Sequence, residues 1–143
     1  MLGRSLDERV FVSPQITPGD ITGLHTAGVT TLICNRPDAE VSPDMSSIAM
    51  AEAAEAAGVT WVHNPLSPGM LTVDVIDMQR EAILGSSGLV FSYCASGTRS
   101  AYLWGFAMAL ADALATEEIL EALTRAGYPA PMLGPQLNKV RPS

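Results

Sequence analysis

The stretch Val90-Phe91-Ser92-Tyr93-Cys94-Ala95-Ser96-Gly97-Thr98-Arg99-Ser100 carries most of the information about the fold and the chemistry of this chain. Its first residues are mostly β-branched or aromatic, which is typical of a buried strand. A loop of small residues follows, and a helical pattern begins after Arg99. A strand, a short loop and a helix in this order are typical of α/β proteins that bind anions at a helix N-terminus.

Cys94 stands where this strand ends and the helix is about to begin. The unpaired N–H groups and the positive dipole end of the helix favour the thiolate. Small residues after Cys94 let successive amides turn inward as an anion-binding nest, and Arg99 adds a planar, charged fork for an oxyanion. The loop therefore predicts a nucleophilic cysteine acting on an anionic group. The predicted catalytic residues are Cys94 and Arg99, and the predicted anion-binding residues are Ala95, Ser96, Gly97, Thr98 and Ser100.

A purely structural role for Cys94 is the alternative, because free cysteine packs like a small hydrophobic residue. Ser96, Gly97, Thr98 and Arg99 are a poor continuation of an apolar core, so the sequence favours the catalytic role.

Strand and helix patterns alternate along the rest of the chain. Strands are predicted over residues 9–13, 29–34, 59–63 and 89–93. Helices are predicted over residues 18–27, 45–57, 100–114 and 116–126, with another that is capped by Thr72 and ends near Leu84, and residues 129–143 are expected to form coil around a short turn. This alternation favours an α/β fold with a central, mainly parallel sheet of about four to five strands flanked by helices. The length of 143 residues and the 48% of hydrophobic residues predict a single domain over residues 1–143.

Composition excludes several classes of partner. The formal net charge of −7 argues against nucleic acid and against acidic membrane surfaces. No apolar run reaches the length of about 18 residues that a membrane span needs, and the first residues lack the apolar region of a signal peptide. Two cysteines suit a reducing compartment, so a cytoplasmic location is expected. Neither His25 nor His63 lies in a cluster with metal-ligand spacing, so neither a metal nor a cofactor is expected.

Polar residues also follow the other predicted strands. Because sites in parallel sheets form beyond the carboxyl ends of the strands, residues 14–15, 35–38 and 64–65 are expected near the Cys94 loop. Arg36 is a candidate second anion contact, and Asp38 is a candidate acid, base or loop anchor. Asn-Arg-Pro-Asp is also good turn chemistry, in which Asn and Asp side chains bond the local backbone. Cys34 is either a resolving thiol or a core residue.

Several segments together resemble a known family, the beta-lactamase-hydrolase-like family, whose phosphatase-like domain occurs alone or fused to beta-lactamase-like metallohydrolases. The resemblance runs from about Val10 to Trp104 and rests on residues 11–18, 33–40, 54–59, 62–65 and 94–100. It implies a protein-tyrosine-phosphatase-like fold, with Cys94 as the nucleophile and Arg99 as the anion clamp.

The Cys94 loop departs from protein tyrosine phosphatases in two ways. Four residues rather than five separate Cys94 from Arg99, and Tyr93 replaces the usual histidine. Four is the loop length of many rhodanese-type sulfurtransferases, so the leading hypothesis is sulfur transfer from thiosulfate or a small-molecule persulfide through a Cys94 persulfide. Sulfite or a thiolate leaves without a strong acid. A persulfide dioxygenase or a metallo-beta-lactamase-like hydrolase would be a functional partner.

Two alternatives remain open. One is a phosphatase that forms a phosphocysteine, which needs an acid for an alkoxide or phenoxide leaving group. Asp38, Asp74 and Asp77 are the candidates, and none stands in an Asp-x-x-Pro acid loop. The other alternative is a non-catalytic anion-binding or thiol redox-sensing module.

Overall fold

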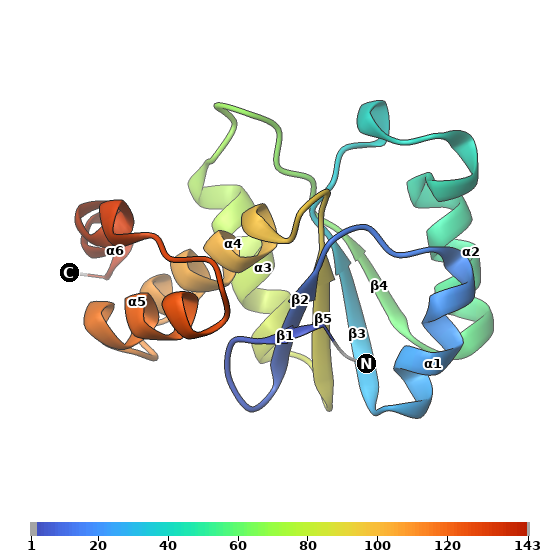
Figure 1. Cartoon of the computed structure of the whole chain (residues 1–143), viewed down its shortest axis with the longest axis horizontal. Coiled ribbons are helices and arrows are strands. Elements are labelled where there is room, and N and C mark those ends of the chain that lie inside the picture. Colours follow the sequence, from blue (N-terminus) through green and yellow to red (C-terminus); the bar gives the residue numbers. More distant parts are fainter. Residues whose placement is uncertain (1–2, 143) are drawn as a thin grey trace.

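A five-stranded sheet forms the centre of the molecule in the computed structural model, which describes residues 3–142 (Figure 1). The strand order is β1-β2-β5-β3-β4, with bounds β1 Arg4–Ser5, β2 Val10–Ser13, β3 Val29–Cys34, β4 Thr60–His63 and β5 Leu89–Tyr93. The last four strands are mutually parallel, and β1 pairs antiparallel with β2. The predicted mainly parallel sheet is confirmed. β1 is absent from the predicted strands because its two residues are exposed and carry no apolar pattern.

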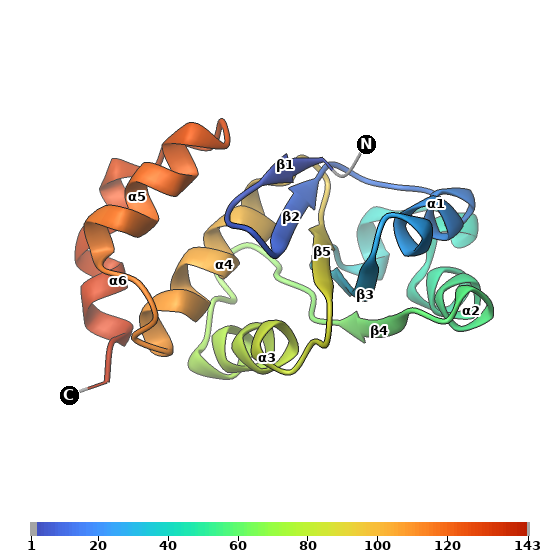
Figure 2. The ribbon, with the colours of Figure 1, turned by 90° about the horizontal axis from the view of Figure 1, so that it is seen from below.

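Helices cover both faces of this sheet. One face carries α1 (Ile21–Thr26) and α2 (Ser47–Ala57), and the other carries α3 (Val73–Leu84) and α4 (Thr98–Leu110) (Figures 1 and 2). α5 (Thr116–Arg125) and α6 (Gly134–Val140) pack outside α4. Among the described residues, none of the helices combines the length and the apolarity that a membrane span requires.

Side chains of β5 alternate between the two apolar layers. Val90 packs in the layer of α3 and α4, whereas Phe91 and Tyr93 pack in the layer of α1 and α2. This alternation follows from the two-residue period of a strand. It agrees with the position of β5 as the central strand of a sheet that is buried on both faces.

The parallel strands end at the same level. Tyr93 lies opposite Ser13 of β2 and Cys34 of β3, and Cys34 lies opposite His63 of β4. The four loops that follow these strands therefore meet at one edge of the sheet, as the sequence predicts. The loop after β5 leads at once into α4, which begins at Thr98, two residues earlier than predicted, and places Arg99 in the first helical turn.

The prediction of coil for the C-terminal tail is wrong. Residues 131–133 form a short 3-10 turn, and α6 follows. Pro135 is compatible with this helix because it lies in the first turn, where proline's missing N–H would have no helical partner. Leu137 is fully buried and anchors the helix against α4 and α5.

Candidate active site

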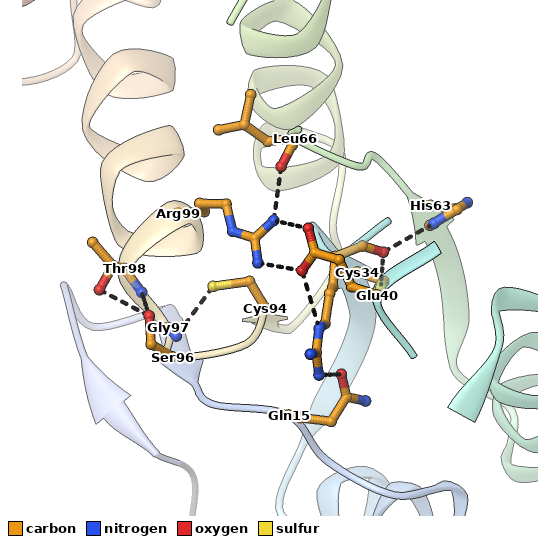
Figure 3. Close-up of polar contacts among 11 residues, drawn as sticks. Gln15, Cys34, Glu40, His63, Leu66, Cys94, Ser96, Gly97, Thr98 and Arg99 are labelled. Atoms are coloured by element: carbon orange, nitrogen blue, oxygen red, sulfur yellow. Dashed lines mark hydrogen bonds and ion pairs between the residues drawn. The ribbon is translucent and has the colours of Figure 1, made fainter. Parts of the chain in front are cut away.

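The Cys94 loop curls around the sulfur of Cys94. Cys94 is fully buried, and the backbone N–H of Gly97 points at its Sγ at 3.1 Å (Figure 3). Gly97 has a φ of 93°, a left-handed conformation that favours glycine. The Ser96 hydroxyl accepts from the Thr98 N–H at 3.3 Å and lies 3.0 Å from the Thr98 hydroxyl, so Ser96 holds the first turn of α4. An amide and a helix N-terminus thus face the thiol.

Arg99 is clamped by two groups from other loops. Its Nη1 donates to Glu40 Oε2 at 3.0 Å and to the Leu66 carbonyl at 2.9 Å, and its Nη2 donates to Glu40 Oε1 at 2.8 Å (Figure 3). These bonds use three of the five N–H donors of a guanidinium. The Nε–H and one Nη2–H form the remaining edge, which lies beside the Cys94 sulfur (Figure 3). That edge is the one that can hold an oxyanion with two parallel bonds.

The charges around Arg99 support this placement. Its hydrogen bonds to Glu40 raise the pKa of Arg99, and the sulfur of Cys94 contributes to the same rise. Figure 3 shows the guanidinium beside the Cys94 sulfur. Arg99 is therefore both oriented by Glu40 and close to the Cys94 thiol.

Glu40 is the site residue that sequence reasoning missed. It lies between Arg99 and Arg36, whose Nε is 3.3 Å from Glu40 Oε1. Its hydrogen bond from Arg99 lowers the pKa of Glu40, so the carboxylate stays ionised. A usable signal exists in the sequence, because Glu40 follows Arg36 in the loop after β3, at the same sheet edge as Arg99.

Arg36 lies near Arg99, with Glu40 between them, and its role as a second anion contact stays a prediction. Its Nη1 donates to Gln15 Oε1 at 3.2 Å, and Gln15 in turn donates its backbone N–H to the Ala95 carbonyl at 3.4 Å. The loops after β2, β3 and β5 are thereby joined by polar contacts.

Asp38 makes the contacts of a loop anchor. Its Oδ1 accepts from the Ser47 N–H at 2.8 Å and its Oδ2 from the Ser47 hydroxyl at 2.6 Å, at the first residue of α2. These bonds lower the pKa of Asp38. Of the other two acid candidates, Asp77 pairs with Arg80 within α3, and Asp74 lies in the first turn of α3.

The sequence predicts Ser100 as an anion ligand, but the structure places its side chain beneath the loop. It is fully buried, and its hydroxyl donates to Asn35 Oδ1 at 2.8 Å beneath the loop. The reason is helical geometry, because Ser100 is the third residue of α4 and faces the sheet.

Cys34 is buried, and its thiol lies 3.4 Å from the Arg36 carbonyl. Burial raises the pKa of Cys34. Its strand neighbours β5, as a resolving thiol would require, but these contacts are those of a core thiol.

The fold and the loop together define a class. A mainly parallel sheet between helices, with a cysteine loop leading from the central strand into a helix, is a protein-tyrosine-phosphatase-like fold, and the solved structures that resemble this chain share it. Within this class, the family model for the phosphatase-like domain of beta-lactamase hydrolase-like proteins matches residues 3–111, and the chain belongs to that family.

Three relatives illustrate the likeness. The beta-lactamase hydrolase-like protein of Agrobacterium fabrum is 29% identical over 105 residues, which are 73% of this chain and 24% of that protein. The chain thus spans about a quarter of that relative's length. A candidate phosphatase from Neisseria meningitidis, known from a crystal structure, is 31% identical with a TM-score of 0.80 over 99% of both chains. PTPMT1 is 16% identical with a TM-score of 0.76, covering 96% of this chain and 92% of its own, and shows likeness of fold alone.

Proposed function

We propose that this chain is a cysteine-dependent phosphatase that hydrolyses phosphate monoesters through a phosphocysteine on Cys94. The observation that carries the proposal is that the edge of Arg99 not held by Glu40 and Leu66 lies beside the Cys94 thiol, which already faces the Gly97 amide. Membership of a phosphatase-like family supports the same chemistry.

The reaction has two steps on one sulfur. The Cys94 thiolate attacks phosphorus, the S–P bond forms, and the P–O bond to the leaving group breaks. Water then attacks phosphorus, the S–P bond breaks, and inorganic phosphate leaves with the thiolate restored. Arg99 and the loop amides hold the non-bridging oxygens in both steps, where charge stabilisation is the main source of rate.

Proton supply limits the choice of substrate. Asp38 and Glu40, both in the loop after β3, have lowered pKa values and stay ionised, so neither is a ready proton donor. The site is therefore suited to phosphate esters whose leaving groups depart with little protonation.

Sulfur transfer is a second candidate, favoured by the four residues between Cys94 and Arg99. In this reaction the Cys94 thiolate attacks the outer sulfur of thiosulfate, the new S–S bond forms, and sulfite leaves with the electron pair. An acceptor thiolate or cyanide then removes the outer sulfur. No proton donor is needed, which also agrees with the ionised carboxylates.

Steady-state assays separate the candidates. The wild type, Cys94→Ser and Cys34→Ser are compared on p-nitrophenyl phosphate, phenyl phosphate and thiosulfate with cyanide. A phosphatase hydrolyses both esters, the nitrophenyl ester faster, and loses this activity in Cys94→Ser but not in Cys34→Ser. Turnover of thiosulfate alone would support the second candidate, and no turnover of any substrate would overturn both.

A further inference from the structure

Asn35 links both ends of the Cys94 loop to the anchor of Arg99. Its backbone N–H donates to the carbonyl of Tyr93, the residue before Cys94, at 2.8 Å, and its backbone carbonyl accepts from the Leu66 N–H at 2.9 Å. Its side-chain Oδ1 accepts from the Ser100 hydroxyl at 2.8 Å, next to Arg99 in the sequence. The Leu66 carbonyl is the backbone group that holds Arg99 Nη1.

The other half of the Asn35 side chain enters a buried polar cluster. Its Nδ2 donates to the Asn64 carbonyl and to Gln79 Oε1, both at 2.9 Å. Gln79 also accepts from Asn64 Nδ2 at 2.9 Å, and its Nε2 donates to the Ser92 hydroxyl at 3.0 Å. All members of this cluster are at most 2% exposed: Asn35, Asn64, Gln79, Ser92 and Ser100.

The cluster permits only one orientation of the Asn35 side-chain amide. With Gln79 Oε1 and the Asn64 carbonyl both facing Asn35, only the amide nitrogen fits there, so the oxygen accepts from Ser100 at 2.8 Å and, more weakly, from Gln79 Nε2 at 3.4 Å. A buried and saturated amide of this kind holds its partners in one position, because any other arrangement leaves a polar group without a hydrogen bond.

We propose that Asn35 is a positioning residue for Arg99, acting through Ser100 on the backbone of α4 and through Leu66 on the guanidinium. The inference rests on the proposed function for its consequence in catalysis. If Asn35 positions Arg99 in this way, the Ser100 hydroxyl contributes to anion binding without touching the anion, because it lies beneath the loop and bonds Asn35. The contacts of Asn35 with Ser100 and with Leu66 keep the remaining edge of Arg99, its Nε–H and one Nη2–H, aligned with the Cys94 loop.

Two buried serines of the same cluster provide a matched pair. Ser100 and Ser92 are 0% and 1% exposed, and each contributes one hydroxyl. Only Ser100 adjoins Arg99, whereas Ser92 lies within β5 and contacts Gln79. Ser100→Ala and Ser92→Ala therefore remove the same chemical group from the same cluster at different distances from the clamp.

The test measures how inorganic phosphate protects Cys94 from alkylation by iodoacetamide, together with the thermal midpoint of each variant. Both variants are expected to lower the midpoint similarly, since each removes one buried hydrogen bond and leaves Asn35 Oδ1 and Gln79 Nε2 with their longer mutual contact at 3.4 Å. Ser100→Ala should raise the phosphate concentration for half-protection by about tenfold, as misplacement of a binding group does, while Ser92→Ala should change it by less than about twofold. In a double-mutant cycle, Ser100→Ala should add no further loss in an Asn35→Ala background.

Equal shifts in half-protection for the two serine variants would overturn the inference, as would full additivity in the cycle or a wild type that phosphate does not protect. If Asn35→Ala does not fold, the serine pair decides alone. Failure of the proposed function looks different: the wild type would bind phosphate and hydrolyse no ester, and the serine comparison would still stand.

Discussion

The guanidinium of Arg99 is fixed before any anion arrives. The Glu40 carboxylate accepts one hydrogen bond from Nη1 and one from Nη2, and the Leu66 carbonyl accepts the second hydrogen bond of Nη1. A group oriented in advance loses little conformational entropy on binding and needs no reorganisation during the reaction. Glu40 therefore contributes to the site by orienting a cation rather than by moving a proton.

Arg99→Lys is expected to keep the fold and to lower kcat by about 10²–10³-fold, the usual cost of losing an oriented donor to a developing charge. Lysine keeps the positive charge but cannot bond Glu40 and an oxyanion through parallel N–H pairs. Steady-state kinetics beside a thermal melt checks both parts. Near-normal kcat in a folded variant would show that charge alone suffices.

Glu40→Gln is expected to make the free energy of unfolding less sensitive to low pH. The pKa of Glu40 is below its ordinary value of 4.5 in the folded protein, so its contribution is fully present above that value and is lost as the pH falls through the folded pKa. The pair with Arg99 is partly exposed, so the contribution is about 1 kcal/mol or less.

Denaturant titrations at several pH values check this expectation. The difference in free energy of unfolding between wild type and Glu40→Gln should be constant near neutral pH and should shrink below pH 4.5. A difference that grows as the pH falls would contradict the assigned ion pair.

At the scale of elements, the turn into α4 is the tightest part of the site. Gly97 has a φ of 93°, and a Cβ at this position would clash with the hydroxyl of Tyr128, from the segment after α5. Gly58, which ends α2, has a φ of 80°, but a Cβ there would meet nothing within 4 Å. The two glycines thus share the left-handed backbone and differ in the space around them.

Gly97→Ala is expected to cost about 3 kcal/mol of stability or more, whereas Gly58→Ala should cost only the backbone term of about 1 kcal/mol. Chemical denaturation of both variants gives the comparison. Tyr128→Phe removes the clashing oxygen and should recover part of the loss at Gly97. Equal costs for the two glycine variants, or no recovery, would show that Tyr128 does not constrain the loop.

Asp38 anchors the first residue of α2, Ser47, from the preceding loop. Asp38→Asn is expected to cost about 1 kcal/mol of stability, as the loss of a side-chain cap does, because the amide cannot accept both Ser47 hydrogen bonds. Hydrolysis of phenyl phosphate, whose leaving group needs a proton, should change by less than about threefold, since a positioned acid would be worth about 10²–10⁴-fold. A large loss that shrinks with more acidic leaving groups would instead make Asp38 the acid.

Elements could be predicted from the sequence where local chemistry decides them. The pattern of β5, the Thr72 cap of α3 and the glycine that ends α2 are local signals, and the structure has these elements where they were expected. The helix in the tail was not predictable from its prolines, because the burial of Leu137 against α4 and α5 stabilises it and is a long-range contact.

At the scale of the whole molecule, the site is assembled from loops that lie far apart in the sequence. The rule that sites form beyond the carboxyl ends of parallel strands brings the segments after β2, β3, β4 and β5 together, and it predicts that Arg36 lies near the Cys94 loop. It does not say which side chains meet. Glu40 bonds Arg99, which lies 59 residues later in the sequence. Asn35 bonds β5, α3, α4 and the loop after β4 rather than its own turn.

The C-terminal helices also belong to this assembly. The family model matches residues 3–111, yet Tyr128 reaches back over Gly97, and Arg4 of β1 donates to the Ala126 carbonyl at 3.3 Å. α5 and α6 bury the outer side of α4, the helix whose first turn carries Arg99. The segment beyond the matched region therefore supports the position of the Cys94 loop.

The central claim is that Cys94 becomes phosphorylated during turnover. The most direct measurement is the intact mass of wild type and Cys94→Ser, quenched in acid during reaction with p-nitrophenyl phosphate and, separately, after incubation with thiosulfate. A phosphoryl-sized adduct is expected on Cys94 in the first reaction, absent from Cys94→Ser and decaying as phosphate is released. A sulfur-sized adduct from thiosulfate, removed by reductant and accompanied by no phosphoryl adduct, would contradict this claim.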